Sequence, residues 1–293
     1  MVGTTKSLGS KHTLDKFYTK PELAKDLLKL LNIEQYNTII EPSAGGGAFS
    51  QYIKGVLAFD LEPEFGGIIK QDYLKLDIND YNIDTNKPIL VVGNPPFGTA
   101  GNLALEFIKH SATFADTIAF ILPLSFAKDS MMNKIPRNFH LKTELVGKRG
   151  KILEEDSFTL NGEDYPVPCV FQVWERRDYE RPIKQAKTKT ELFEFVTNIE
   201  ESDCRIQRVG GNAGVAFSDR RGAKQSNYYI KLNKSMLRKY NLDTVQDFID
   251  CINQLNYETV NLTVGPRSLS KTELITTLER ELIRNTKTSL QGV

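Results

Sequence analysis

The feature that most constrains the fold is an apolar run, residues 88–92, that breaks at Gly93 and leads directly into an Asn-Pro-Pro-Phe turn. Such a run predicts a short buried strand, and open α/β sheets place their ligands at the carboxyl ends of strands. Prolines fix φ and lack an N–H donor, so the turn can hold its carbonyl groups outward. The plainer interpretation is a strand that ends in a proline turn, with Phe97 in the core.

The residue types of this turn suit one kind of chemistry. An exocyclic amino group on a heteroaromatic ring is a poor nucleophile, because its lone pair is delocalised into the ring. Acceptors aimed at its two N–H bonds favour the pyramidal form that can attack. The side chain of Asn94 and the main chain of Pro95 would supply such acceptors, and Phe97 offers a face for stacking. The candidate catalytic residues are therefore Asn94, Pro95, Pro96 and Phe97.

Three other predicted strands end in residues suited to a nucleotide-like ligand. Residues 38–40 lead into a glycine-rich turn, where the backbone can approach a ligand closely, and we expect a helix to follow. Residues 57–59 end at an acid that could accept both hydroxyls of a ribose, and residues 68–71 end at an acid and a ring that could meet an adenine. A helix cap is the simpler interpretation of each acid alone. The candidates are Glu41, Pro42, Ser43, Gly45, Asp60, Asp72 and Tyr73.

An aromatic pair precedes the first predicted helix. Phe17, Tyr18 and Thr19 stand before residues 22–31, whose leucines recur at helical spacing. Thr19 is a predicted N-cap, and Glu22 would complete a capping box. The helix should therefore begin beside the aromatic pair.

Composition narrows the class of protein. With 293 residues and 40% hydrophobic content, the chain can form one large or two modest domains. No apolar run approaches a membrane span, and the first residues carry no apolar signal core, so we expect a cytoplasmic protein. The three cysteines are far apart and in no paired spacing, so neither a disulfide framework nor a zinc site is indicated.

Charge is unevenly distributed along the chain. Residues 181–293 hold 18 basic and 13 acidic residues, whereas the remainder holds 20 and 24. Residues 205–239 contain nine basic residues and the single acid Asp219. Such a patch would attract phosphates, although a solvated surface is the plain alternative. The candidate nucleic-acid-binding residues are Phe158, Arg205, Arg208, Arg220, Arg221, Lys224 and Tyr228. Phe158 could stack on a base, and a core residue is its plain alternative.

The order of predicted elements suggests two domains, residues 1–180 and 181–293. The first continues with strands at 117–126, 141–146 and 169–174 and a loop or hairpin at 150–168. A charged linker, residues 177–190, leads to a small α+β module. In this module we expect strands at 205–215, 228–232 and 259–264 and helices at 245–255 and 270–283.

Taken together, these motifs resemble the S-adenosylmethionine-dependent amino-group methyltransferases, above all the N6-adenine DNA methyltransferases. The matching segments, in order, are Phe17–Thr19, Glu41–Gly47, Asp60, Asp72, Asn94–Phe97 and Leu122–Phe126. The resemblance is to the group in which the cofactor-clasping segment comes first and target recognition last. It implies a Rossmann-like seven-stranded methyltransferase sheet, and a bacterial, phage or viral setting fits it.

The resemblance also implies a cofactor and roles for the residues. S-adenosyl-L-methionine would be the cofactor, with Tyr18 and Thr19 closing over it and Asp60 on its ribose. Asp72 would take its adenine amino group. Glu41, Pro42 and Gly45 would line its amino-acid end. The implied reaction is in-line methyl transfer to the N6 amino group of a flipped adenine in DNA, with no metal.

Other functions remain compatible with the same turn. Asn-Pro-Pro followed by an aromatic residue also serves enzymes that methylate adenine or guanine in RNA, and others that methylate a glutamine side chain in protein. The basic C-terminal region disfavours a protein substrate but does not separate DNA from RNA. A nucleic-acid-binding protein on the same fold, without turnover, is the alternative of a different class.

Overall fold

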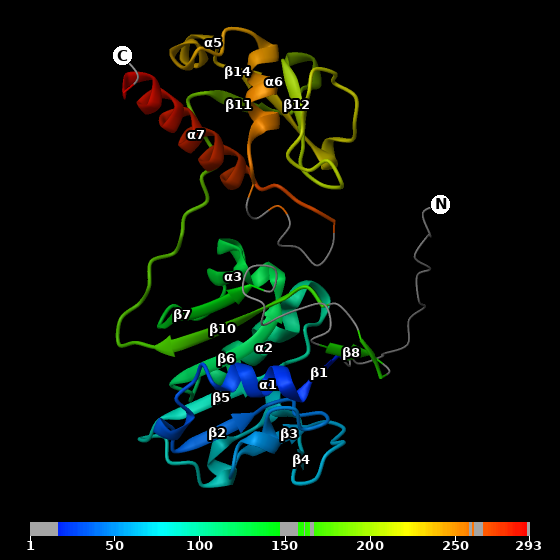
Figure 1. Ribbon diagram of the computed structural model, residues 1–293, viewed down its shortest axis with the longest axis vertical. Coiled ribbons are helices and arrows are strands. Elements are labelled where there is room, and N and C mark those ends of the chain that lie inside the picture. The colour runs from blue at the N-terminus through cyan, green and yellow to red at the C-terminus, as the bar shows by residue number, and fades with distance from the viewer. Residues whose placement is uncertain are drawn as a thin grey trace. The chain divides into compact units, whose positions relative to one another are not determined.

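The computed structural model describes residues 17–146, 158–160, 162–164, 167–257, 260 and 266–291, with side chains to residue 285. The chain forms two compact units (Figure 1). Unit 1 comprises Met1–Pro123 and Asn133–Pro182, and unit 2 comprises Leu124–Met132 and Ile183–Val293. Residues 124–132, including helix α3 (Asp129–Met132), thus belong to unit 2, whereas the predicted boundary leaves them in the first domain.

A seven-stranded sheet forms the centre of unit 1, in the order β4-β3-β2-β5-β6-β10-β7. The first five strands in this order are parallel to their neighbours, and β10 pairs antiparallel with both β6 and β7. This arrangement confirms the predicted Rossmann-like seven-stranded sheet. The strands are β2 (Thr38–Glu41), β3 (Leu57–Asp60), β4 (Ile69–Lys70), β5 (Ile89–Gly93), β6 (Thr117–Pro123), β7 (Phe139–Val146) and β10 (Cys169–Arg176).

The central strands β5 and β6 are buried along their whole length. Strands covered on both faces are continuous apolar runs, which is the pattern that both segments show in the sequence. Helix α1 (Pro21–Leu28) contributes Leu23 and Leu27 to the hydrophobic cluster that contains Leu90 and Val92 of β5. Helix α2 (Asn102–Ser111) contacts β6.

The topology brings the predicted ligand-binding segments to one edge of the sheet. The chain passes from β2 to β3 and β4 on one side, and then returns to β5 on the other side of β2. The strand order therefore reverses between β2 and β5, and such switch points are where open α/β sheets bind ligands. The carboxyl ends of the two strands carry Glu41 and Gly93, and Asn94 follows directly.

A small antiparallel sheet accompanies this edge. It consists of β1 (Tyr18–Thr19), β8 (Phe158–Leu160) and β9 (Glu163–Asp164), and it pairs Thr19 with Phe158. The hairpin predicted at 150–168 is described only in part, because residues 150–157, 161, 165 and 166 lie outside the described residues.

The predicted capping role of Thr19 is wrong. Helix α1 begins at Pro21, its N-cap is Lys20, and no side chain caps it. Proline suits the first helical position because its φ is already helical and its missing N–H needs no partner there. Thr19 is instead a strand residue of β1.

The helix predicted after the glycine-rich turn is also wrong. Only a short 3₁₀ helix, Ser50–Tyr52, follows the turn. Within the turn itself, Gly45 and Gly47 have φ of +48° and +79°, conformations that residues with a side chain rarely adopt. A Cβ on Gly47 would lie 2.7 Å from the ring of Phe65, so the turn is also too crowded for a side chain at this position.

Unit 2 is an α+β module, as predicted. Its antiparallel sheet has the order β11-β14-β12-β13, and helices α6 and α7 share a hydrophobic core with it through Phe248, Ile252, Leu274 and Leu278. The elements are β11 (Phe193–Val196), β12 (Cys204–Gln207), β13 (Ala216–Phe217), β14 (Asn227–Leu232), α5 (Lys234–Leu237), α6 (Val245–Gln254) and α7 (Lys271–Gln291).

The strand predicted at 205–215 is much shorter, because the chain turns after β12 and returns as β13. The strand predicted at 259–264 falls outside the described residues, except for residue 260.

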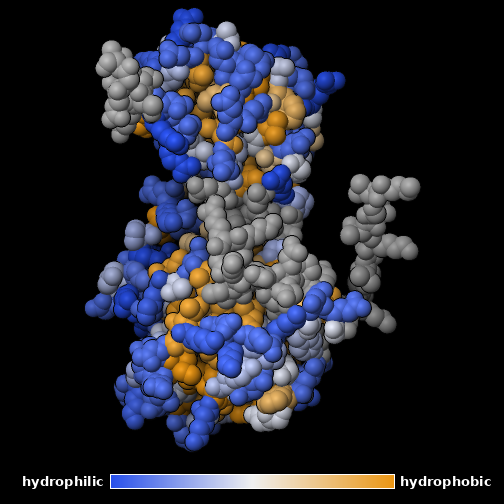
Figure 2. Space-filling view, viewed as in Figure 1, coloured by the Kyte–Doolittle hydropathy of each residue, from blue (hydrophilic) through white to orange (hydrophobic). Residues whose placement is uncertain are grey.

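The surface of unit 1 mixes polar and apolar side chains. Figure 2 shows hydrophobic side chains between stretches of hydrophilic surface on the face in view. Leu61 and Phe65 are about half exposed, at 50% and 47%. Among the helices that the structure describes, none has the length and apolar character that a membrane crossing requires.

Candidate active site

A cavity of about 600 Å³ opens at the carboxyl ends of β2, β3 and β5 in unit 1. Its volume lies in the range of small-molecule pockets, roughly 300–1,000 Å³. The cavity gathers all the predicted catalytic and cofactor-binding residues, although they span 80 residues of sequence. They are Phe17, Tyr18, Thr19, Glu41, Pro42, Ser43, Gly45, Asp60, Asp72, Tyr73, Asn94, Pro95, Pro96 and Phe97.

The side-chain amide of Asn94 is held in one orientation. Its Nδ2 donates to Thr19 Oγ1 at 3.1 Å and to the carbonyl oxygen of Phe17 at 3.3 Å. Its main-chain carbonyl accepts a hydrogen bond from Ser43 Oγ at 3.0 Å. Asn94 Oδ1 is buried and has no hydrogen-bond partner in the described part of the chain. An unpaired buried acceptor costs about 1–3 kcal/mol, so the arrangement favours a ligand that donates to Oδ1.

The rest of the proline turn is divided between the core and the cavity. Pro95 is buried, and Phe97 is partly buried against the hydrophobic cluster that contains α1. The plainer interpretation of Phe97 as a core residue is thus partly right. Phe97 nevertheless contributes to the cavity wall.

Glu41 is the second buried acceptor. The residue is 1% exposed, and its Oε2 has no hydrogen-bond partner among the described residues. Burial raises the pKa of the Glu41 carboxyl to about 8, because hydrogen bonds from Phe49 and Ser50 only partly offset the loss of solvation. The nearby charge of Asp60 adds to this rise in pKa. Glu41 is therefore protonated at neutral pH until a cationic group reaches it.

Asp60 holds the glycine-rich turn in place. Its Oδ2 accepts from the Gly45 N–H at 2.8 Å, and its Oδ1 accepts from the Glu62 N–H at 2.8 Å. Each carboxylate oxygen can accept a further hydrogen bond, so the side chain retains capacity for hydroxyl groups in the cavity. The ribose-binding role remains a prediction.

Asp72 and Tyr73 both make contacts within the fold that the sequence does not reveal. Asp72 caps the short 3₁₀ helix Tyr73–Lys75 by accepting from the Leu74 N–H at 3.1 Å, so the helix-cap interpretation is right for this acid. Tyr73 is 2% exposed and shares a 2.7 Å hydrogen bond with Ser111 Oγ. Its ring stacks on Phe107, with 5.4 Å between centroids, so it forms part of the cavity wall rather than a projecting platform.

Glu64 is a cavity residue that the sequence did not single out. Its Oε1 accepts from the Tyr18 hydroxyl at 2.7 Å, and its N–H donates to the Gly45 carbonyl at 3.1 Å. The Tyr18 ring lies beside Gly45, 3.5 Å from the position of a Cβ. Tyr18 and Glu64 together therefore cover the glycine-rich turn. The only signal in the sequence is the acidic stretch after Asp60.

The predicted nucleic-acid-binding residues do not form one group. Phe158 belongs to unit 1, where it is 1% exposed, and it contributes to the cavity wall. The other six lie in unit 2. Among them, Arg220, Arg221 and Lys224 are exposed.

Arg205 does not present its charge to solvent, contrary to expectation. Its side chain is 12% exposed, and its Nε and Nη2 donate to the Asp219 carboxylate at 3.0 and 3.2 Å. Nη1 donates to Asn227 Oδ1 at 3.0 Å, and the guanidinium lies 4.0 Å from the centroid of the Phe217 ring. Because its donors are used within unit 2, Arg205 is a structural residue.

Tyr228 and Arg208 are likewise engaged within unit 2. The Tyr228 hydroxyl donates to the Leu269 carbonyl at 3.0 Å, and its ring packs against Phe195. The Arg208 guanidinium lies 5.3 Å from the centroid of that ring. These contacts within unit 2 do not support the predicted nucleic-acid-binding role of Tyr228.

No metal site is evident in the described part of the chain, where no three His, Cys, Asp or Glu side chains cluster. Cys169 and Cys204 are buried, and burial raises the pKa of each thiol to about 12.

Comparison with known proteins gives limited similarity. No protein-family model matches the chain. The chain is 27% identical over 128 residues to ribosomal RNA small subunit methyltransferase A of Francisella tularensis subsp. novicida (strain U112), covering 38% of this chain and 47% of that protein. It is 26% identical over 168 residues to the protein of the same name from Francisella tularensis subsp. tularensis (strain FSC 198), covering 49% and 62%. The chain thus spans about half the length of these curated relatives.

Among solved structures, a Pyrococcus horikoshii protein provisionally described as an RNA methyltransferase is 15% identical, with a TM-score of 0.38. The match covers 57% of this chain and 90% of that protein.

Proposed function

We propose that this protein is an S-adenosylmethionine-dependent methyltransferase that acts on the exocyclic amino group of a base in nucleic acid. The observation that carries the proposal is the buried acceptor Asn94 Oδ1, which is held at the switch point of the sheet and has no partner in the described residues. Glu41 and Asp60 line the same cavity. The sequence similarity to ribosomal RNA methyltransferases supports the reaction class.

The cavity fits the cofactor at two points. Glu41 has a buried oxygen without a partner, and the α-amino group of S-adenosylmethionine would supply both a donor and a positive charge. Asp60 retains acceptor capacity for ribose hydroxyls. Asp72 would accept from the adenine amino group, and Tyr18 with Thr19 would cover the bound molecule. When bound, S-adenosylmethionine supplies a methyl group activated by a sulfonium sulfur.

The residues of the proline turn would align the target nitrogen. Asn94 Oδ1 and the Pro95 carbonyl would accept its two N–H bonds, which localises the lone pair for in-line attack. Thr19 and Phe17 keep the acceptor end of the amide toward the substrate, because they occupy the donor end. Phe97 would stack on the base. As the new N–C bond forms, the bond between the methyl carbon and the sulfonium sulfur would break, and the cofactor would leave as a neutral thioether. The nitrogen would then release one proton to water, so no strong side-chain base is required.

We propose RNA as the favoured substrate, in place of the DNA expected from the sequence. The relatives are named for ribosomal RNA, and this is the observation that favours RNA. DNA adenine remains the second candidate, because the order of motifs resembles the DNA enzymes. In either substrate the base must leave its stack to reach Asn94, which single-stranded regions of RNA permit at low cost.

The test is transfer of radiolabelled methyl from S-adenosylmethionine to structured RNA, single-stranded DNA and duplex DNA. We expect label in RNA above that in either DNA. Label confined to DNA would contradict RNA as the substrate but would still support methyl transfer to nucleic acid. Cofactor binding without label in any nucleic acid would contradict the proposed function and favour a non-catalytic binding protein.

A further inference from the structure

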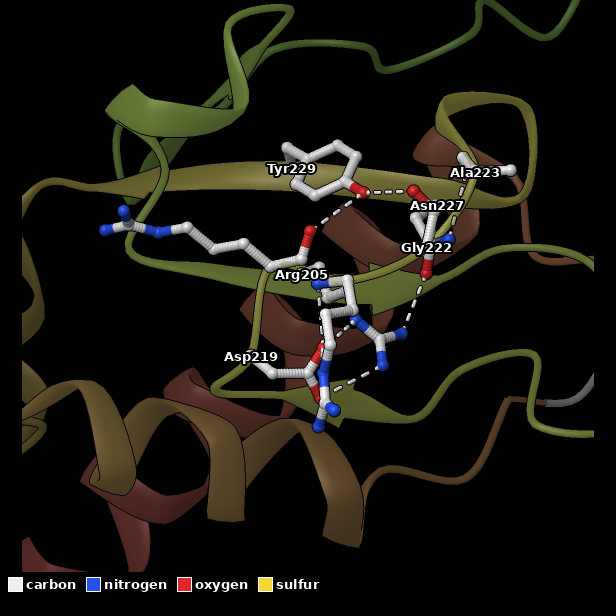
Figure 3. Close-up of polar contacts among 8 residues, drawn as sticks. Arg205, Asp219, Gly222, Ala223, Asn227 and Tyr229 are labelled. Atoms are coloured by element: carbon white, nitrogen blue, oxygen red, sulfur yellow. Dashed lines mark hydrogen bonds and ion pairs between the residues drawn. The ribbon is translucent and has the colours of Figure 1, made fainter.

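A loop of unit 2, residues 218–226, presents three cations within five residues. It joins β13 to β14, and Arg220, Arg221 and Lys224 are all exposed on it. Figure 3 shows the polar contacts at the base of this loop. Like charges so close together repel one another, so the loop must be held in shape by other contacts.

The backbone of the loop is fixed by side chains beneath it. The Tyr229 hydroxyl lies 2.8 Å from the Gly222 carbonyl oxygen and 3.4 Å from that of Arg220. Asn227 Nδ2 donates to the Ala223 carbonyl at 3.0 Å. Tyr229 is 3% exposed and Asn227 is 8% exposed, so largely buried side chains hold the exposed loop through part-buried contacts (Figure 3).

The one acid of the loop is used internally. Asp219 accepts two hydrogen bonds from Arg205 and one, at 2.8 Å, from the Arg221 N–H. These contacts hold the pKa of the Asp219 carboxyl below its usual value. Arg205 is largely buried, and its charge neutralises that of Asp219. The charges of the exposed Arg220, Arg221 and Lys224 are therefore largely uncompensated.

The remaining ion pairs of the loop are weak. Arg221 Nε lies 3.7 Å from Asp219 Oδ1, and its side chain is 90% exposed. Arg220 Nη1 lies 3.7 Å from Glu200 Oε2, and that glutamate is 85% exposed. Exposed pairs of this kind contribute little, so a polyanion can displace them at small cost.

We propose that residues 218–226 are a preformed phosphate-binding loop that holds the sugar–phosphate backbone of the nucleic-acid substrate, with Arg205 and Asp219 as its positioning residues. Guanidinium groups match phosphate geometry, and a loop fixed before binding loses little entropy when it binds. A polymer of adjacent phosphates suits three adjacent cations better than a single anion does. The identity of this polyanion rests on the proposed function.

The first test removes the exposed charges. A variant with Arg220→Gln, Arg221→Gln and Lys224→Gln is compared with wild type for binding to a labelled single-stranded RNA, without cofactor, over a series of salt concentrations. Each phosphate contact contributes about 0.7 to the slope of log affinity against log salt for single strands, so the slope should become shallower by about 2. We expect affinity in about 50 mM salt to fall roughly 10- to 100-fold.

A matched control removes the same charge elsewhere in unit 2. Lys231, Lys234 and Lys239 are exposed, and the control replaces all three with glutamine. We expect a loss of affinity of less than about threefold in this control. If the two variants lose affinity equally, binding depends on diffuse charge and the proposed loop is overturned.

The second test separates a preformed loop from simple charge attraction. Asp219→Asn removes a negative charge, so charge attraction alone predicts tighter RNA binding. The proposal predicts binding about fivefold weaker, because Arg205 no longer holds the loop. Tyr229→Phe changes no charge and removes only the hydroxyl beneath the loop, and it should weaken binding about twofold. If thermal unfolding shows that Asp219→Asn unfolds unit 2, Tyr229→Phe still tests the proposal. Tighter or unchanged binding in the folded variants overturns the proposal.

These measurements do not depend on catalysis. A wild type that binds RNA through the loop but transfers no methyl group would contradict the proposed function and leave this inference standing. Loop variants that bind RNA as wild type does would overturn the inference, whatever the methyl-transfer assay shows.

Discussion

The cavity of unit 1 and the basic loop of unit 2 (residues 218–226) differ in whether their inward-facing polar groups have hydrogen-bond partners. In the cavity, Asn94 Oδ1 and Glu41 Oε2 are buried without partners in the described part of the chain. At the base of the loop, Asp219, Asn227 and Tyr229 all have partners, and only the charges that point outward remain.

The difference indicates two kinds of recognition. A buried acceptor without a partner is unfavourable until a donor arrives in the correct direction, so the cavity selects a ligand by the position of its N–H groups. An exposed cation on a fixed loop attracts any polyanion, because phosphate contacts position a nucleic acid without reading its sequence. The cavity would therefore decide which atom reacts, and the loop would decide how firmly the substrate is held.

The largest effect is expected at Asn94, and it tests whether the cavity selects its ligand by the position of an N–H group. Asn94→Ala removes the acceptor Oδ1, and methyl transfer should fall by about 10³-fold, as when one preorganised hydrogen-bonding group is lost from an active site. Cofactor affinity, measured by calorimetry, should change less than about threefold. A variant that retains more than a tenth of the wild-type rate would contradict the role of Asn94.

The second prediction concerns Glu41 and pH. The pKa of this carboxyl in the folded protein is about 8, against an ordinary value of 4.5. Between about pH 5 and pH 8 the folded state therefore keeps a proton that the unfolded state has released, so the wild type loses stability as pH rises. Glu41→Gln lacks this titration. Over this range the wild type should lose roughly 3–4 kcal/mol relative to the variant in urea unfolding. Parallel pH profiles would contradict the protonated Glu41.

The third prediction tests how Asn94 is oriented. Thr19→Val keeps the shape of the side chain and removes the acceptor of Asn94 Nδ2. The amide can then rotate, so kcat measured at saturating cofactor should fall about tenfold. Thr19→Ser keeps the hydroxyl and should recover most of the rate. Equal loss of kcat in both variants would indicate a packing role for Thr19 instead.

The smallest effect is expected at the base of the loop. Gly222 has φ of +137°, and a Cβ there would lie 2.6 Å from Asn227 Nδ2. Gly222→Ala should destabilise unit 2 by about 1 kcal/mol and weaken RNA binding about twofold, without changing methyl transfer at saturating RNA. Gly211→Ala is the matched control, because a Cβ at Gly211 meets nothing within 4 Å. A change in the saturated rate would contradict the separation of the two roles.

Much of unit 1 could be predicted from the sequence because its strands are buried. The apolar runs of β5 and β6 stand out in any sequence, and polar residues directly after such runs come to one edge of a parallel sheet. For this reason Glu41, Asp60 and Asn94 were predicted together and line one cavity.

The failures concern side chains whose partners lie far away in the sequence. Thr19 looked like a helix cap because its local sequence permits one, but its hydroxyl contacts Asn94, 75 residues away. Arg205 was counted with the exposed cations because a count of charges does not reveal its contact with Asp219. Glu64 was missed because its partner, Tyr18, comes from another part of the chain.

The central claim is that Asn94 presents a directed acceptor to an exocyclic amino group. The most direct measurement is mass-spectrometric identification of the methylated nucleoside, and of the atom that carries the methyl group, after single-turnover reaction with RNA. The account predicts methyl on an exocyclic amino nitrogen, N6 of adenine or N2 of guanine, and its absence with Asn94→Ala. Methyl on a ring nitrogen, a ring carbon or the ribose 2′-oxygen would contradict it.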